Sequence, residues 1–511
     1  MEEFIKELNQ RKAKARLMGG EPKVALQHQL GHLTARERVE KLADPGSFME
    51  LGLLNHSDTP GVEDKTPADG LVAGLAKINS RPVAVSATDK TVLAGTEGTV
   101  YMRKERLLAE LAVKRGYPLI HLGEGGGLRM PDGMGSDGIS ERMMPMHFLR
   151  HGRQTLTIAT IMGDSFGGPT WTAVSADFAV QVKGTCMAVS GPRMLEIATA
   201  EKITPEELGG WQIHAETTGQ VDCFAENDEH CLQIVKEFFS YMPSNPREEP
   251  PFVATKDDPY RQVDEVVKLV PTKLNRACDM KRVIKAIVDE GKMFELKPYF
   301  GKALLTCLAR INGRVVGIIA SQPAFNAGAG GPDECDKATD FICLCDSYNV
   351  PMIFLHDIPG FFVGSFAEKH RMPTKIMVWN QALAWSTVPK ISIVIRKSIG
   401  AAYSNMCGPD MGADFVVAWP LAEISFTGSE VGVNVVYGRQ LAESPNADEE
   451  RKKLLEQWSF ENAPWRAAAK HLIDDVIDPR DTRKFLAQAL EYSCRNGSFS
   501  QRRLANWPTG F

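Results

Sequence analysis

Short apolar segments rich in β-branched residues alternate along the chain with stretches whose apolar residues recur at helical spacing. Residues 157–161 and 391–395 are the clearest of the short segments. Segments of this kind, separated by helical stretches, are typical of parallel strands joined by crossover helices. The pattern therefore predicts an α/β fold.

The beginning of the chain is expected to be helical, with an interruption at Gly19 and Gly20. A helix is expected to start again after Thr34. Thr34 and Glu37 have the spacing of a capping box, in which each side chain satisfies the backbone N–H of the other residue.

The chain also contains an internal duplication. Three pairs of segments match at one shift of 233 positions: 75–81 with 308–314, 117–120 with 350–353, and 165–168 with 398–401. Residues 176–180 match residues 413–417 with a shift of 237, which indicates a small insertion in the second copy. Agreement of three separated segments at one shift predicts two copies of one domain.

A proline-rich segment separates the two copies. Residues 241–251 contain four prolines and several polar residues, which disfavour helices and strands. We therefore expect a linker here, with one domain over residues 1–245 and a second over residues 252–511.

Composition excludes several classes of function. The chain of 511 residues has a formal net charge of −5 and no stripe of Lys and Arg, so nucleic acid is not an expected partner. The chain has no apolar leader and no apolar run of about 18 residues, so we expect a cytoplasmic protein without a membrane segment. Its ten cysteines show no CxxC pairing and its histidines no ligand spacing, so no metal site is predicted.

The third duplicated segment places small residues directly after a predicted strand in each copy. Gly167 and Gly168 correspond to Gly400 and Ala401, and Pro169 suits the first position of a following helix. Such a turn leaves backbone N–H groups uncovered near the positive end of a helix, where they can stabilise an oxyanion. A tight turn that needs glycine only for its dihedral angles is the alternative. Two oxyanion sites would suit a transfer between two enolisable carbonyl compounds.

Two further segments, 124–129 and 357–361, end the strands predicted to begin near Leu119 and Met352. Ligands of open α/β sheets gather at such strand ends. Neither segment has the Lys-Ser/Thr of a P-loop or the GxGxxG spacing of a dinucleotide fold, and no GxSxG motif occurs. Nucleoside triphosphates, NAD and a covalent serine nucleophile are therefore disfavoured.

Characteristic segments occur at both ends and in the middle of the chain: 33–38, 44–48, 207–210, 357–361, 418–420, 473–479 and 482–483. In these segments the sequence resembles the β chain of propionyl-CoA and acetyl-CoA carboxylases, and the similarity extends over nearly the whole chain. The resemblance implies two tandem domains of the crotonase-like (ClpP/crotonase) fold. It also implies that the chain is the carboxyltransferase subunit of a biotin-dependent acyl-CoA carboxylase.

The resemblance implies a mechanism without a dedicated side-chain base, in which the enolate of a CoA thioester attacks CO2 released from carboxybiotin. The amides of Gly167 and Gly168 would hold the thioester enolate oxygen, and those of Gly400 and Ala401 the ureido oxygen of biotin. The first domain would thus be the acyl-CoA side and the second the biotin side. The substrate-binding residues implied in this way are Gly95, Thr96, Gly126, Gly127, Trp171, Gly360, Phe361 and Ser404.

The resemblance also implies cofactors and partners. The sequence contains no biotin-attachment segment and no ATP-binding loop, so a biotin carboxylase and a biotin carboxyl carrier would be separate chains. Biotin, carried as carboxybiotin, and an acyl-CoA would be required. Members of the family form active sites between subunits, so a homohexamer is expected.

Departures from the family leave the substrate open. Residues 372–377 differ from the usual biotin-side segment, and Ser404 stands where propionyl-preferring members have Asp. Pro169 and Trp171 replace the residues that commonly follow the two glycines, and a bulky indole would reshape the acyl pocket.

Three alternatives to carboxylation remain. A biotin-dependent decarboxylase of a malonyl-, methylmalonyl- or glutaconyl-type CoA ester would use the same chemistry in reverse. A crotonase-type hydratase or isomerase would need carboxylates such as Glu124 or Asp164 over the substrate. A non-catalytic subunit would retain only CoA binding.

Overall fold

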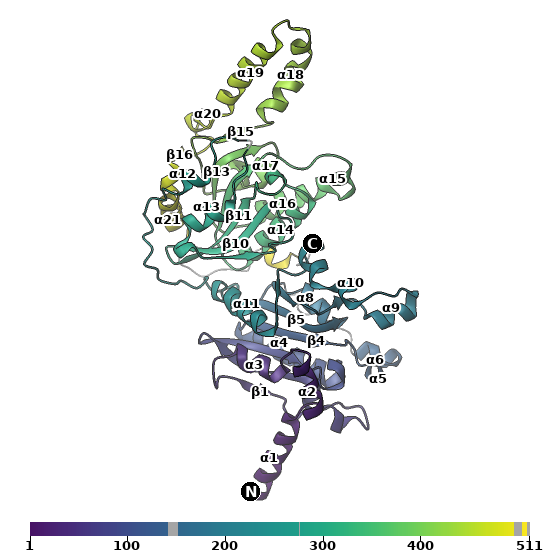
Figure 1. Cartoon of the computed structure of the whole chain (residues 1–511). Helices are drawn as coiled ribbons and strands as arrows, with labels where there is room; N and C mark the ends of the chain where they lie inside the picture. Colours follow the sequence, from purple (N-terminus) through teal and green to yellow (C-terminus); the bar gives the residue numbers. More distant parts are fainter. Residues whose placement is uncertain (142–151, 275, 495–502, 508–511) are drawn as a thin grey trace. The chain divides into compact units, whose positions relative to one another are not determined.

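The computed structural model of the chain describes residues 1–141, 152–274, 276–494 and 503–507. The chain divides into two compact units, residues 1–248 and residues 249–505 (Figure 1). Asn506 and Trp507 group with the first unit, although the sequence suggested that they belong to the second. The contact is specific, because Arg153 Nη1 donates a hydrogen bond to the carbonyl oxygen of Trp507 at 3.0 Å.

The chain begins with three helices: α1 (Glu2–Arg16), α2 (Glu21–Gln29) and α3 (Ala35–Leu42). The predicted interruption is confirmed, since Gly20 has φ 87° between α1 and α2. The capping box of α3 is also confirmed. The N–H of Thr34 donates to Glu37 Oε2 at 2.8 Å, and the N–H of Glu37 donates to Thr34 Oγ1 at 3.3 Å.

The first unit is built on a mixed sheet. Its strands, in spatial order, are β1 (Met49–Leu51), β2 (Leu71–Ile78), β3 (Arg81–Thr88), β4 (Leu119–Gly125), β5 (Thr157–Phe166), β6 (Phe178–Val182) and β8 (Cys223–Ala225), with β7 (Met187–Ala188) paired to the end of β5. From β3 onward the neighbours are parallel, as predicted for crossover connections.

The second unit repeats this sheet. Its strands, in the corresponding order, are β9 (Met293–Leu296), β10 (Leu304–Ile311), β11 (Arg314–Ser321), β12 (Met352–Ile358), β13 (Lys390–Ile399), β14 (Phe415–Ala418) and β16 (Asp475–Val476), with β15 (Glu423–Ser425) paired to the end of β13. Every pairing in the first sheet has a counterpart of the same direction in the second. The internal duplication is therefore confirmed.

Each sheet differs from the prediction at one edge, where antiparallel strands replace parallel ones. β2 and β3 form a hairpin, as do β10 and β11. The first turn, Asn79 and Ser80, has φ 50° and 65°, and the second, Asn312 and Gly313, has φ 51° and 77°. Two consecutive positive φ values are the requirement of a type I′ turn, which Asn favours and Gly completes. The duplicated segments 75–81 and 308–314 already contained this hairpin signal.

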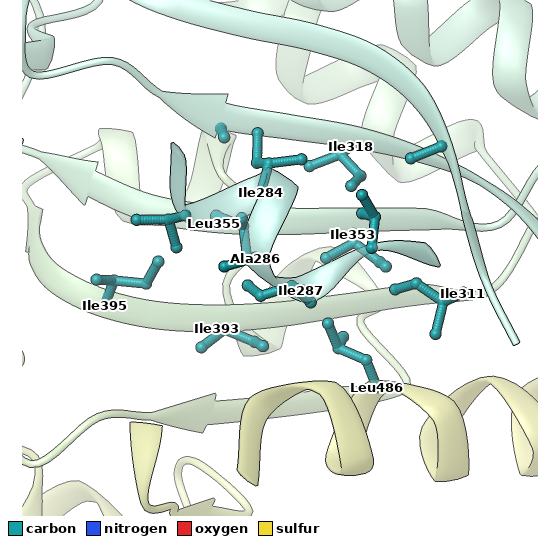
Figure 2. Close-up of a cluster of buried hydrophobic side chains, with 14 of the residues drawn as sticks. Ile284, Ala286, Ile287, Ile311, Ile318, Ile353, Leu355, Ile393, Ile395 and Leu486 are labelled. Carbon is teal, nitrogen blue, oxygen red and sulfur yellow. The ribbon is translucent and has the colours of Figure 1, made fainter. Parts of the chain in front are cut away.

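The core of the second unit lies between its sheet and two helices, α13 (Met280–Ile287) and α21 (Thr482–Ser493) (Figure 2). Ile284 and Ile287 lie on one face of α13, since they are three residues apart. They join one buried cluster with Leu486 of α21 and with isoleucines of β12 and β13. This packing fixes the two strands whose ends form the candidate site of this unit.

The proline-rich segment lacks regular structure, as predicted. α11 (Asp228–Tyr241) ends at its first residue, and residues 242–251 contain neither helix nor strand. Within the parts of the chain that the structure describes, each helix is too short or too polar to cross a lipid bilayer.

Candidate active sites in the two units

In the first unit, β5 leads into a short helix through a turn of two glycines. β5 ends at Phe166, and α8 (Gly168–Val174) begins two residues later with Pro169 in its first turn. Gly167 has φ 66° and ψ −117°, a conformation that is strained for any residue with a Cβ. Glycine is therefore required here by the turn itself.

The two amides of this turn have different surroundings. The N–H of Gly167 donates to the carbonyl oxygen of Ala188 at 3.3 Å, because β7 pairs with the end of β5. Among the described residues, no hydrogen-bond acceptor is found for the N–H of Gly168. The Gly168 amide is thus the one available to a ligand oxygen.

The second unit repeats this arrangement. β13 ends at Ile399, Gly400 has φ 65°, and Ala401 (φ −59°, ψ −24°) precedes α17 (Ala402–Asn405). The N–H of Gly400 donates to the carbonyl oxygen of Ser425 in β15 at 2.9 Å. No acceptor for the N–H of Ala401 is present in the part of the chain that the structure describes. Each turn therefore presents one unused amide, at Gly168 and at Ala401.

The loop after β3 contains two of the predicted acyl-side residues, Gly95 and Thr96. Gly95 has φ 66°, and a Cβ built there would lie 2.5 Å from the carbonyl oxygen of Glu124. The Thr96 hydroxyl donates to the carbonyl oxygen of Leu93 at 2.8 Å, so it stabilises the loop itself. The equivalent loop after β11 places Gly328, 233 positions later, in the same positive-φ conformation.

Gly126 and Gly127 join this loop to the turn. The N–H of Gly126 donates to Ala94 at 3.2 Å, and the carbonyl oxygen of Gly127 accepts a hydrogen bond from the N–H of Glu97 at 2.9 Å. A Cβ on Gly127 would lie 2.7 Å from the carbonyl oxygen of Phe166. The structure therefore brings the predicted acyl-side glycines together beside the Gly167 turn.

Trp171, the remaining acyl-side residue, lies in the first turn of α8. Its N–H donates to the carbonyl oxygen of Gly167 at 3.1 Å, and its side chain is 44% exposed. A large exposed indole next to the turn is available to a substrate.

In the second unit, a cavity of about 560 Å³ opens at the corresponding turn. Gly360, Phe361, Gly400 and Ala401 all line it, so four predicted biotin-side residues share one cavity. This volume is in the range of small-molecule sites. The unusual segment 372–377 begins α16 (Met372–Trp385), and three of its residues, Met372, Pro373 and Ile376, line the same cavity.

Ser404 differs from these residues. It lies in α17, where its N–H donates to the carbonyl oxygen of Ala401 at 3.0 Å, and it does not line the cavity.

Lys397 is a functional candidate that the sequence analysis did not identify. It lies three residues before Gly400 and lines the cavity, and no ion-pair partner within 4.0 Å is found for it among the described residues. Across the ladder, Glu423 lines the cavity too. Burial raises the pKa of the Glu423 carboxyl, and the charge of Lys397 partly offsets this rise. A shift of 233 places Asp164 at the equivalent position of the first unit, where it accepts a hydrogen bond from the N–H of Cys186 at 3.2 Å.

The carboxylate of Glu124 is held in a buried hydrogen-bond network. Its side chain is almost fully buried, where Arg38 Nη1 and Gln27 Nε2 both donate to it, and Arg38 Nε also donates to Asp228 at 2.8 Å. A hydratase that used Glu124 as its base would first have to break this network. Within the described ranges, no group of three or more His, Cys, Asp or Glu side chains could hold a metal ion.

Comparison with known proteins identifies similar sequences. A family model described as the carboxyl transferase domain matches residues 26–506. The chain is 35% identical to the methylmalonyl-CoA carboxyltransferase 12S subunit of Propionibacterium freudenreichii subsp. shermanii, over 99% of this chain and 98% of that protein. It is 34% identical to the methylmalonyl-CoA decarboxylase subunit alpha of Veillonella parvula, over 96% of both chains.

The fold has a close counterpart among solved structures. A crystal structure of transcarboxylase 12S, a hexamer with methylmalonyl-coenzyme A and methylmalonic acid bound, superposes with a TM-score of 0.92. The sequences are 35% identical, and the superposition covers 99% of this chain and 98% of that one. The predicted pair of crotonase-like domains is thereby confirmed.

Proposed function

We propose that this chain, which belongs to the carboxyl transferase domain family, moves a carboxyl group between carboxybiotin and the α-carbon of an acyl-CoA. The first unit would bind the acyl-CoA and the second would bind biotin. The observation that carries the proposal is the repeated turn, with one unused amide at Gly168 and one at Ala401. One transfer reaction between two enolisable carbonyl groups needs two such donors.

At the acyl side, the Gly168 amide would hold the thioester oxygen as it becomes an enolate oxygen. The first residue of α8 lies at the positive end of a helix, which adds to this stabilisation. Since the Gly167 amide already donates to Ala188, Gly168 would contribute more than Gly167. Gly95, Thr96, Gly126 and Gly127 would shape the adjoining CoA site, and Trp171 would limit the acyl chain.

At the biotin side, the residues present fit a ureido ring that bears a carboxylate. When bound, biotin supplies the carrier nitrogen for CO2. The Ala401 amide would hold the ureido oxygen, and the unpaired ammonium of Lys397 would attract the carboxylate within the cavity that Gly360 and Phe361 also line. Ser404, outside the lining, would act on the acyl chain or ring only through α17.

The reaction requires other chains. A biotin carboxyl carrier would deliver the cofactor, and a biotin carboxylase would load it when carboxylation is the net reaction. We place the active site between subunits of a homohexamer, as the hexameric 12S relative suggests. The Veillonella relative supports biotin-dependent decarboxylation of a carboxyacyl-CoA as the second candidate, because the same two turns serve both directions.

A panel of carboxyacyl-CoA esters, from malonyl and methylmalonyl to longer chains, tests the proposal. CO2 loss is measured with and without free biotin. We expect loss that depends on biotin. Loss that is indifferent to biotin would identify an independent decarboxylase, and no turnover of any ester would identify a binding subunit.

Ala401→Pro tests the second turn directly. Its φ of −59° already suits proline, so the substitution removes the N–H with little change of backbone. We expect biotin-dependent loss to fall by about 10² to 10³, the usual effect of removing one oxyanion donor. Ala401→Ser keeps the N–H and is the matched control. Equal rates for the two variants would show that this amide plays no part.

A further inference from the structure

Glu97 has a largely buried side chain, and no partner for its carboxyl group is found among the described residues. Glu97 is 8% exposed. Two hydrogen bonds hold its backbone: its N–H donates to the carbonyl oxygen of Gly127, and its carbonyl oxygen accepts from the N–H of Arg129 at 2.9 Å. Neither carboxyl oxygen has a hydrogen-bond or ion-pair partner in the described part of the chain. Buried carboxyl groups are normally paired, so this one requires an explanation.

The carboxyl group lies against the acyl-side turn. A Cβ built on Gly168 would lie 2.5 Å from Glu97 Oε2 and 3.0 Å from Oε1. Glycine at position 168 therefore leaves the space that the carboxyl group fills. Glu97 also faces a small cavity of about 20 Å³, which Pro169 and Thr172 of α8 line as well. A cavity of this volume holds about one water molecule.

Among the described residues that line this cavity, none is a lysine or an arginine. α4 (Thr99–Arg115) contributes Tyr101 and Glu105, and β4 contributes His121, whose Nδ1 lies 3.4 Å from Glu105 and 2.8 Å from the Ser86 hydroxyl. α8 contributes no titratable side chain to the cavity.

The guanidinium of Arg129, which lies against the neighbouring Gly98, is occupied elsewhere. It pairs with Asp69 at 2.9 Å and Asp132 at 3.3 Å, and it donates to the carbonyl oxygen of Thr96. Burial, and next the charge of Glu105, raise the pKa of Glu97 to about 8.

We infer that Glu97 is a positioning residue of the acyl-side turn that functions as a neutral acid. The protonated carboxyl supports the backbone of Gly168, whereas a carboxylate in the same place would oppose the enolate charge held by the Gly168 amide. The inference rests on the proposed function. It adds that the acyl side is active only while Glu97 is protonated. The equivalent position in the second unit is Gly330, so this dependence on protonation belongs to the acyl side alone.

Glu97→Gln, which stays neutral at all pH values, tests the inference. The rate of biotin-dependent CO2 loss from methylmalonyl-CoA or malonyl-CoA is measured between about pH 6.5 and about pH 9.5 for both proteins. We expect the wild-type rate to fall as Glu97 ionises around pH 8. The rate of Glu97→Gln relative to wild type should rise about tenfold or more over this range. An unchanged ratio would overturn the inference.

Glu105→Gln distinguishes this dependence from a packing role. In Glu105→Gln, the pH at which activity has fallen by half on the alkaline side should be lower than in wild type. The reason is that the Glu105 charge helps to keep Glu97 protonated. A packing role for Glu97 would leave this pH unchanged.

A direct measurement separates this inference from the proposed function. Infrared difference spectra of wild type and Glu97→Gln at about pH 7 should show the band of a protonated carboxyl group, whether or not any ester is turned over. Its absence would overturn the inference even if carboxyl transfer is found. Failure of every ester in the panel would instead remove the proposed function.

Discussion

The two units share one backbone but differ in the charges around their turns. Gly168 and Ala401 occupy equivalent positions, and within the described ranges neither amide has an acceptor. Three residues before each turn, Asp164 in the first unit corresponds to Lys397 in the second. Beside the first turn lies Glu97, where the second unit has Gly330. The duplicated turn has thus kept its hydrogen-bond geometry, while the charges around it differ between the two units.

Both units also bury a carboxylate at the end of an equivalent strand. Substitutions at the arginines that pair with these carboxylates should have the largest effects on stability. Glu124 and Asp357 are 233 positions apart, but Arg38 of α3 pairs with the first, and Arg396 of β13 pairs with the second at 2.7 Å. Arg38→Met would remove the buried guanidinium from both Glu124 and Asp228, so we expect it to lower the free energy of unfolding by about 3 to 5 kcal/mol.

Arg396→Met would remove the guanidinium from one carboxylate, Asp357, instead of two, and should cost less. Chemical denaturation of the two variants gives the comparison, with Arg38→Lys as a control that keeps the charge. Equal losses for Arg38→Met and Arg396→Met would show that the second carboxylate at Arg38 adds nothing to stability.

The second prediction concerns stability and Glu97, which has no counterpart in the second unit. Its pKa is raised from 4.5 to about 8, so the folded state keeps a proton that the unfolded state loses above about pH 4.5. The contribution of this group is complete below that value and is lost as the pH rises through about 8. Glu97→Gln should therefore gain stability relative to wild type, by about 4 kcal/mol between about pH 5 and about pH 9.

Denaturation at a series of pH values measures this difference, and other titrating groups cancel because both proteins contain them. Glu430→Gln, at an exposed glutamate of the second unit, is the control, and its difference from wild type should stay constant with pH. A constant difference between wild type and Glu97→Gln would show that Glu97 ionises at the same pH in both states.

The third prediction concerns the position three residues before each turn, where the first unit has Asp164 and the second has Lys397. Lys397→Met removes the cation from the cavity that we propose for biotin. We expect kcat/KM for biotin-dependent transfer to fall about tenfold, as for one partly exposed charge. Lys397→Arg should retain most of the activity. Lys292→Met, at an exposed lysine of the same unit that pairs with Glu290, should have no effect. Retained activity in Lys397→Met would show that the carboxylate is held by backbone amides alone.

The sequence predicted those features of the two units that depend on residues close together in the chain. Matches at a shift of 233 located both turns, and the helices, the capping box and the parallel strands followed from spacing. The availability of each amide was beyond such reasoning. It depends on β7 and β15, strands of two and three residues that leave no hydrophobic pattern, whose residues Ala188 and Ser425 accept the hydrogen bonds of Gly167 and Gly400.

Glu97 escaped prediction for a related reason. Its burial depends on Gly168, which is distant in the sequence. It has no ion pair with Arg129 because Arg129 pairs with Asp69 instead. Gly95 could have been found more securely, because the same shift pairs it with Gly328. The antiparallel hairpins were also within reach, since Asn79 and Asn312 lie inside the segments that revealed the duplication.

These hairpins give the smallest and cleanest test of the comparison. The second residue of the turn is Ser80 in the first unit, with φ 65°, and Gly313 in the second, with φ 77°. Glycine adopts this conformation without a steric penalty, and Ser80 is exposed with its N–H bonded to Asp44 Oδ2, a bond that a substitution retains. Ser80→Gly should therefore raise the free energy of unfolding by about 0.5 to 1 kcal/mol.

A matched substitution at ordinary φ separates this relief of strain from the entropy that glycine adds to the unfolded chain. Ser190 is also exposed, and its φ is negative, so Ser190→Gly should lower stability slightly. Gly313→Ser should lower it most, because a Cβ there would lie 2.5 Å from the carbonyl oxygen of Val253. If Ser80→Gly and Ser190→Gly lower stability alike, the first hairpin carries no strain, and the duplicated turns differ in sequence without differing in energy.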